Sequence, residues 1–337
     1  MFGMCTSILQ LTRDGRHILA RTMDWHRLAV QPVFVPRNFR WQSVFDNRWH
    51  TSRYAMIGGG GAHHHEIDVS DGVNERGLSV QKLTFANGSQ LVDHPTPGKV
   101  HLAPYEFSYY LLANFGTVAE IEAHLAEIEL MSSQFAVNPI GDAELHFAVV
   151  DRTGRTVVIE PTHFPMTIRE NPLGVVTNSK DFEVQLSRLG QYVTYTDDFL
   201  AGTVPLNTPR VTTGKFSGKP VPSGSFTPGG RFARAAYYKE RVDFPDDEAA
   251  GIISAWHLLN SVTVPQSHHY RPTYSVYRAA TSCESLTYYF QPYNRLDVVK
   301  LQLTPAMLTA TEVKFYPVAN ALQVTSLNDQ PEQVSHE

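Results

Sequence analysis

Met4-Cys5-Thr6-Ser7 begins the stretch from which the organisation of this chain can be inferred. The stretch ends with Arg21-Thr22-Met23-Asp24. Between the two segments, polar and apolar side chains alternate on both sides of Asp14-Gly15, a dipeptide typical of tight turns. This pattern predicts a β-hairpin. At about 3.3 Å per strand residue the two arms have similar lengths, so we expect Arg21 and Asp24 to lie beside Cys5.

The position of Cys5 near the start of the chain suggests a specific chemistry. Initiation or trimming can remove residues 1–4, and the mature chain would then begin with a cysteine that carries a thiol and an α-amine. An α-amino group titrates near pH ~8 and can take the proton of its own thiol. A neighbouring guanidinium favours the thiolate, and a carboxylate can hold the ammonium. The alternative is a buried strand cysteine without chemistry.

Five short motifs follow one another along the chain: Met4–Ser7, Ala20–Asp24, Asp71–Gly77, Val176–Ser179 and Phe226–Phe232. Together they resemble the choloylglycine hydrolase family, which comprises bile salt hydrolases and penicillin V acylases. The resemblance extends from residue 5 to about residue 290.

The resemblance implies a role for each matching position. Cys5 would be the nucleophile, Arg21 and Asp24 would stabilise and orient it, and Arg231 would complete the polar network. Asn178 would donate to the oxyanion together with a backbone N–H near Thr84, and no metal or organic cofactor is implied. Thr84 departs from the family, because bile salt hydrolases usually carry Asn there and several penicillin V acylases carry Tyr.

These positions suggest a cysteine hydrolase that cleaves a linear non-peptide amide through an acyl-enzyme. Trp25 and Phe85 stand beside Asp24 and Thr84, and their rings would form an apolar pocket for the acyl group. Thr84 and the segment ending at Trp25 favour a penicillin V acylase-like enzyme or a general N-acyl amide hydrolase. A bile salt hydrolase that removes glycine or taurine is the alternative, and a binding protein of the same fold without catalysis is a rival from another class.

Composition limits the possible partners. The net charge is −5 and no run of Lys or Arg occurs, which argues against nucleic acid and anionic membranes and favours a small-molecule amide. No basic segment precedes an apolar one, and no apolar run approaches ~18 residues, so we expect a cytoplasmic protein without a signal peptide or membrane span. Cys5 and Cys283 are the two cysteines, and we expect both to remain thiols.

The order of elements suggests the architecture. Strand patterns precede helices that begin near residues 105 and 117, a second hairpin covers residues 145–160, and helical patterns resume at residues 231–239 and 247–262 before further strands. Two sheets between two helical layers would result, and the resemblance implies the same α+β, four-layer αββα sandwich of N-terminal-nucleophile hydrolases. We expect one catalytic domain over residues 5–325 and a polar tail over 326–337. The resemblance also implies a homotetramer.

Four segments are interpreted as loops or turns. Gly58 to Gly61 are expected to form flexible backbone near the pocket mouth, and residues 71–77 a turn. Residues 63–66, His-His-His-Glu, are interpreted as a solvated loop, because adjacent histidines on an extended chain point to opposite faces and do not converge on a metal. Residues 201–230 are rich in Gly, Pro, Ser and Thr and are interpreted as a functional loop.

Overall fold

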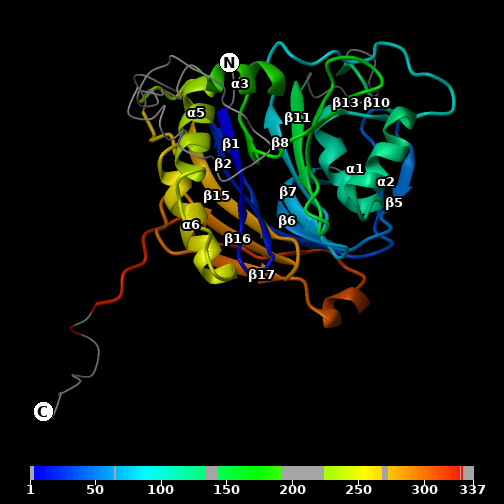
Figure 1. Cartoon of the computed structure of the whole chain (residues 1–337). Helices are drawn as coiled ribbons and strands as arrows, with labels where there is room; N and C mark the ends of the chain where they lie inside the picture. The colour runs from blue at the N-terminus through cyan, green and yellow to red at the C-terminus, as the bar shows by residue number, and fades with distance from the viewer. Residues whose placement is uncertain are drawn as a thin grey trace, which may run out of the picture.

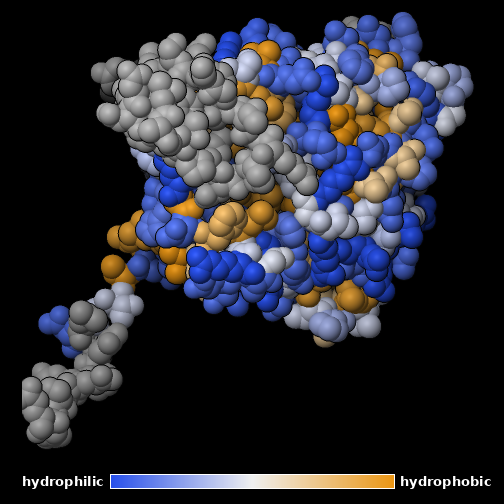
Figure 2. All heavy atoms as spheres, in the orientation of Figure 1, coloured by the Kyte–Doolittle hydropathy of each residue, from blue (hydrophilic) through white to orange (hydrophobic). Residues whose placement is uncertain are grey.

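The computed structural model describes residues 4–63, 66–133, 143–190, 224–267, 272–326 and 328. Two large antiparallel sheets stack face to face, and helices cover the outer side of each sheet (Figure 1). The α+β, four-layer αββα architecture predicted from the sequence is confirmed. On the face drawn in Figure 2, hydrophobic residues occur in small groups among hydrophilic ones. No helix within the described residues is long and apolar enough to cross a membrane.

The first sheet has six strands in the order β14-β1-β2-β15-β16-β17. Their bounds are β1 Met4–Leu11, β2 His17–Trp25, β14 Val175–Val176, β15 Tyr274–Ser282, β16 Thr287–Pro292 and β17 Val299–Gln302. α5 (Pro228–Lys239) and α6 (Glu248–Asn260) pack on its outer face, and α3 (Phe182–Leu189) packs against α5.

The second sheet has eight strands in the order β13-β12-β11-β8-β7-β6-β3-β18. Their bounds are β3 Gln31–Val35, β6 Met56–His63, β7 Glu66–Asn74, β8 Ser79–Thr84, β11 Leu145–Val150, β12 Thr156–Glu160, β13 Thr167–Glu170 and β18 Lys314–Phe315. α1 (Phe107–Asn114) packs on this sheet, with α2 (Val118–His124) beside it (Figure 1). The smaller elements are β4 Arg40–Gln42 with β5 Trp49–Thr51, β9 Val100–Leu102 with β10 Ile128–Leu130, and the 3₁₀ turns Pro104–Glu106, Leu125–Glu127 and Pro305–Thr309.

The predicted N-terminal hairpin is present. β1 and β2 pair antiparallel, with Cys5 opposite Met23 and Met4 opposite Asp24. Gly15 occupies the turn at a φ of 82°, a left-handed conformation that glycine adopts without a steric penalty. The hairpin lies between β14, which pairs with Ser7 and Ile8 of β1, and β15, which pairs with β2.

Two sequence interpretations were wrong. Gly58 to Gly61 form the middle of strand β6 and not a loop, and residues 71–74 complete strand β7 before a turn closes at Gly77. The backbones of β6 and β7 approach so closely that a Cβ on Gly58 would lie 2.2 Å from the Asp71 carbonyl oxygen. The glycines are therefore needed for close strand pairing, which a local sequence pattern does not distinguish from flexibility.

Other expectations fall partly outside the described residues. His64 and His65 of the histidine cluster, residues 201–223 of the long loop, and residues 327 and 329–337 of the tail are among these. The helix expected from Arg231 begins earlier, at Pro228, because Thr227 caps its N-terminus by accepting the Gly230 N–H at 3.3 Å. Proline at the first helical position suits such a start, and the result places Arg231 in the first turn.

Candidate active site

Cys5 lies on β1 with 2% of its surface exposed. Its backbone nitrogen donates a hydrogen bond to Asn178 Oδ1 at 2.6 Å, and its carbonyl oxygen accepts one from Arg231. Its Sγ lies 3.9 Å from Met23 Sδ. This nitrogen is the amide of the Met4–Cys5 peptide bond, and it stands in for the α-amine that removal of residues 1–4 would create.

Asn178 connects three parts of the site. It stands two residues beyond β14, is 3% exposed, and accepts a second hydrogen bond on Oδ1 from Arg231 Nη2 at 2.7 Å. Its Nδ2 donates to the Thr84 carbonyl oxygen at 2.8 Å. Both donors face Oδ1 and the acceptor faces Nδ2, so the orientation of the side-chain amide is fixed by its partners.

Arg231 is fully buried in the first turn of α5. Its Nε donates to the Phe226 carbonyl at 2.9 Å, and its Nη1 donates to Thr6 Oγ1 at 2.7 Å as well as to the Cys5 carbonyl. Because two of these acceptors belong to Cys5 and Thr6, the guanidinium fixes the chain on the C-terminal side of the proposed nucleophile.

Asp24 is fully buried on β2 beside the proposed new terminus. Its Oδ1 accepts a hydrogen bond from Ser275 Oγ at 2.6 Å, whereas its Oδ2 has no donor within the described part of the chain. Burial raises the pKa of Asp24 to about 6, against the opposing effects of the Arg231 charge and the Ser275 hydroxyl. An incompletely solvated carboxylate at this place suits a cationic partner such as an N-terminal ammonium.

Arg21 is fully buried and lies on β2. Its Nη1 donates to the Lys82 carbonyl at 2.8 Å and approaches Asp71 Oδ2 at 3.3 Å, while its Nη2 lies 3.4 Å from Met23 Sδ. Burial acts to lower the pKa of Arg21, but the nearby Cys5 and Asp71 outweigh this effect and raise it. Arg21 and the Cys5 thiol thus approach the same methionine sulfur.

Asp71 is a member of the site that the sequence reasoning missed. It is fully buried and accepts hydrogen bonds from the Tyr277 hydroxyl at 2.5 Å and the Tyr288 hydroxyl at 2.7 Å, in addition to its contact with Arg21. Burial, followed by the Asp71 charge, raises the pKa of both tyrosines well above the ordinary value, so both hydroxyls remain donors. Asp71 belongs to a motif noted in the sequence, but the two tyrosines and Ser275 carry no local signal.

The glycines of β6 leave room for the hydrogen bonds between Asp71 and the two tyrosines. A Cβ on Gly59 would lie 2.3 Å from Tyr288 Oη and 2.9 Å from Asp71 Oδ1. Carbon cannot approach these oxygens so closely, so the absence of a side chain on β6 permits the tyrosine to reach Asp71.

The three predicted substrate-side residues differ in exposure. Thr84 ends β8 and Trp25 ends β2, and both are half-buried. Phe85 is only 1% exposed, and its ring stacks on that of His146 at 4.5 Å and 11°. Trp25 therefore offers surface to a ligand, whereas Phe85 belongs to the packed interior in this structure. No group of three or more potential metal ligands occurs among the described residues.

Several known proteins are similar to this chain in sequence. The family of linear amide C–N hydrolases described as the choloylglycine hydrolase family matches residues 5–316. The chain is 28% identical to a bile salt hydrolase/transferase of Clostridium perfringens, over 96% of this chain and all of the relative. It is 24% identical to a penicillin V acylase of Pectobacterium atrosepticum, over 81% of this chain and 73% of the relative.

Solved structures give the same result for the fold. A variant of the conjugated bile acid hydrolase from Clostridium perfringens superposes with a TM-score of 0.82 at 26% identity, over 96% of this chain and all of that one. A penicillin V acylase from Agrobacterium tumefaciens gives 0.69 at 21% identity, over 92% and 90% of the two chains. The four-layer sandwich is thus that of N-terminal-nucleophile hydrolases.

Proposed function

We propose that this chain, which belongs to the choloylglycine hydrolase family of linear amide C–N hydrolases, cleaves a non-peptide amide through an acyl-enzyme on Cys5. Family membership confirms the resemblance inferred from the five motifs. The observation that supports the cysteine mechanism is the contact between the Cys5 nitrogen and Asn178, with Arg231 bonded to both residues.

The proposed reaction begins with removal of residues 1–4. The α-amine of Cys5 then occupies the position of the present amide, where Asn178 Oδ1 accepts one of its hydrogens. Asp24 Oδ2 supplies the partner for the ammonium form. The amine takes the thiol proton, and the positive charge of Arg21 favours the thiolate that attacks the substrate carbonyl carbon.

The attack produces a negatively charged oxygen that needs donors. The Asn178 amide nitrogen carries two N–H groups, and Thr84 takes one of them. The second N–H, with a backbone N–H near Thr84, is the proposed donor pair for the oxyanion. The ammonium then gives its proton to the leaving amine, which breaks the C–N bond, and water hydrolyses the thioester to release the acid and free Cys5.

The identity of the nucleophile can be tested with the two cysteines. Cys5→Ala should abolish turnover, whereas Cys283→Ala should retain it, because Cys283 is buried in a separate small cluster with Leu9, Leu19 and Val150. Intact mass of active protein should show that Met1 to Met4 are absent. Near-normal turnover by Cys5→Ala, or full activity in protein that retains Met4, would refute the mechanism.

Two candidates remain for the acyl group. Thr84 and the half-buried Trp25 support a penicillin V acylase-like enzyme acting on phenoxyacetyl or other N-acyl amides. The higher identity and complete coverage of the bile salt hydrolase relative support glycine- and taurine-conjugated bile acids as the second candidate. Rates on penicillin V, penicillin G, glycocholate, taurocholate and N-acyl amino acids under one condition would distinguish the two.

We further propose that specificity is set on the acyl side. Burial of an apolar acyl group contributes ~25 cal/mol per Å², so about 100 Å² of buried surface contributes ~2.5 kcal/mol, more than a single hydrogen bond of ~1 kcal/mol on the leaving amine. Changing the acyl group should therefore alter kcat/KM more than changing the amine; strict dependence on the amine would contradict this.

A homotetramer is also proposed from family resemblance, and light scattering coupled to size exclusion would test it.

A further inference from the structure

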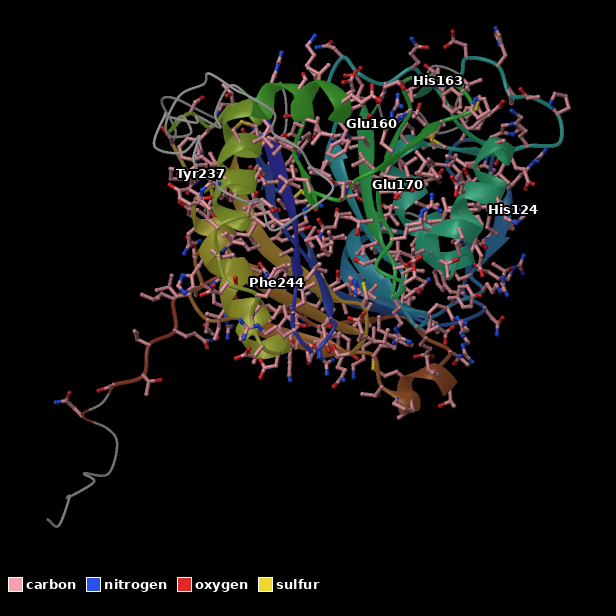
Figure 3. The ribbon with its side chains drawn as sticks, viewed as in Figure 1. His124, Glu160, His163, Glu170, Tyr237 and Phe244 are labelled. Atoms are coloured by element: carbon pink, nitrogen blue, oxygen red, sulfur yellow. The ribbon has the colours of Figure 1, made fainter. Side chains whose placement is uncertain are left out.

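A buried histidine–glutamate pair lies next to the site but has no role in the mechanism above. His146 on β11 is 1% exposed and Glu160 on β12 is 2% exposed. His146 Nδ1 lies 3.4 Å from Glu160 Oε1. Figure 3 labels Glu160 at the end of the sandwich where α3 lies.

The other ring nitrogen of His146 holds the peptide that carries Asn178. His146 Nε2 is 2.7 Å from the Thr177 carbonyl oxygen, and since a carbonyl only accepts, Nε2 must carry the hydrogen. The Thr177 carbonyl and the Asn178 N–H belong to one planar peptide group. The hydrogen bond therefore fixes the plane from which the Asn178 side chain projects.

The face of the His146 ring packs against Phe85, the residue that follows Thr84. It stacks on Phe85, with ring centroids 4.5 Å apart and planes within 11°. The Phe85 N–H shares a peptide group with the Thr84 carbonyl, which accepts the hydrogen bond from Asn178 Nδ2. His146 is thus connected to both partners of the Asn178–Thr84 bond.

Glu160 orients the histidine. Its Oε1 also accepts the backbone N–H of Phe182, the first residue of α3, at 2.9 Å. The N-terminus of a helix favours a negative charge. Glu160 Oε1 faces His146 Nδ1 across 3.4 Å, on the side of the ring opposite the Thr177 carbonyl. These two contacts keep the imidazole ring in its orientation.

We infer that His146, oriented by Glu160, is a positioning residue that holds the Asn178 amide against Thr84 and so aims its second N–H at the oxyanion. Neither His146 nor Glu160 touches the substrate in this arrangement. The expected effect on kcat rests on the proposed function. The expected effect on the position of the Asn178 side chain does not.

Two substitutions separate the hydrogen bond of His146 from its packing. His146→Phe keeps an aromatic ring for Phe85 and removes the donor to Thr177. His146→Gln restores an N–H donor at a similar reach without the ring. His101 provides a matched control, because it is 6% exposed on β9, and its Nε2 lies 2.9 Å from the Thr96 carbonyl and 3.5 Å from Glu129.

The kinetic test compares kcat and KM in these variants. A displacement of about 1 Å in a positioned group can cost ~10²-fold in rate, so His146→Phe should lower kcat on that order with KM nearly unchanged. His146→Gln should recover most of the loss, and His101→Phe should leave kcat close to that of the parent. An equal loss of kcat in His101→Phe, or no recovery in His146→Gln, would overturn the inference.

A structural test works without any substrate. In a crystal structure of His146→Phe, Asn178 Nδ2 should move out of hydrogen-bond range of the Thr84 carbonyl, whereas in His146→Gln the contact should persist. An unchanged contact in His146→Phe would refute the positioning role even if the enzyme is active. A parent protein that hydrolyses none of the amides would instead refute the proposed function, and the crystallographic comparison would still decide this inference.

Discussion

Replacing Gly59 with alanine should destabilise the protein strongly, although the change adds a single methyl group. That methyl would lie 2.3 Å from Tyr288 Oη and 2.9 Å from Asp71 Oδ1. Overpacking in a filled interior costs about 1–3 kcal/mol. Displacement of the tyrosine hydroxyl from the Asp71 carboxylate adds about 1.5–3 kcal/mol. We therefore expect the free energy of unfolding to fall by roughly 2.5–6 kcal/mol.

Gly61 supplies the control on the same strand. Among the described residues, a Cβ there would meet only the Ala29 carbonyl oxygen, at 3.2 Å, so Gly61→Ala should change the free energy of unfolding by less than about 1 kcal/mol. Tyr288→Phe should relieve part of the clash, because it removes the hydroxyl that the new methyl meets.

Urea denaturation of Gly59→Ala, Tyr288→Phe and the double variant Gly59→Ala/Tyr288→Phe would measure the coupling between Gly59 and Tyr288. The double variant should lose at least about 2 kcal/mol less than the sum of the single variants. Additive losses, or a Gly59→Ala protein as stable as Gly61→Ala, would show that β6 does not need its glycines to accommodate the tyrosine.

Two further predictions concern the polar groups around Cys5. Asn178→Ala should lower kcat by ~10²–10³ with little change in the free energy of unfolding, and an unaffected kcat would exclude Asn178 as an oxyanion donor. In a Cys5→Ala chain that retains Met4, Asp24→Asn should raise the free energy of unfolding at pH 8 by roughly 3 kcal/mol. The pKa of Asp24 is about 6 in the folded protein, above its ordinary value of 3.8, because burial penalises the charged form only in the folded state. This gain should shrink as the pH falls through 6 and vanish below 3.8, where Asp24 is protonated in both states; a gain that does not depend on pH in urea denaturation would refute the burial argument.

Sequence reasoning succeeded where the deciding interactions are local. The hairpin that brings Asp24 near Cys5 follows from alternation and a turn dipeptide, and its pairing sets Met4 opposite Asp24 and Cys5 opposite Met23. The helix starting at Val118 follows from Thr117, whose hydroxyl accepts the Glu120 N–H at 3.1 Å. These signals act within a few residues, so they can be found without knowledge of the fold.

The missed features depend on residues far apart in the chain. The glycines of β6 were interpreted as flexible. They are needed because the Tyr288 hydroxyl reaches Asp71, and these two residues are 217 positions apart in the sequence. Ser275, which donates to Asp24, lies 251 residues from it. Asn178 and Arg231 were proposed through the family resemblance and not through spacing, since no local pattern distinguishes them from other buried polar residues.

The position of β15 between β2 and β16 has a consequence for how the protein is made. The ribosome produces β1 and β2 first, yet the strand that pairs with β2 begins at Tyr274. At 5–20 residues per second, the nascent hairpin waits roughly 12–50 s for that strand. During this interval its unpaired edge is open to wrong partners, so the emerging N-terminus is where a chaperone would be needed most.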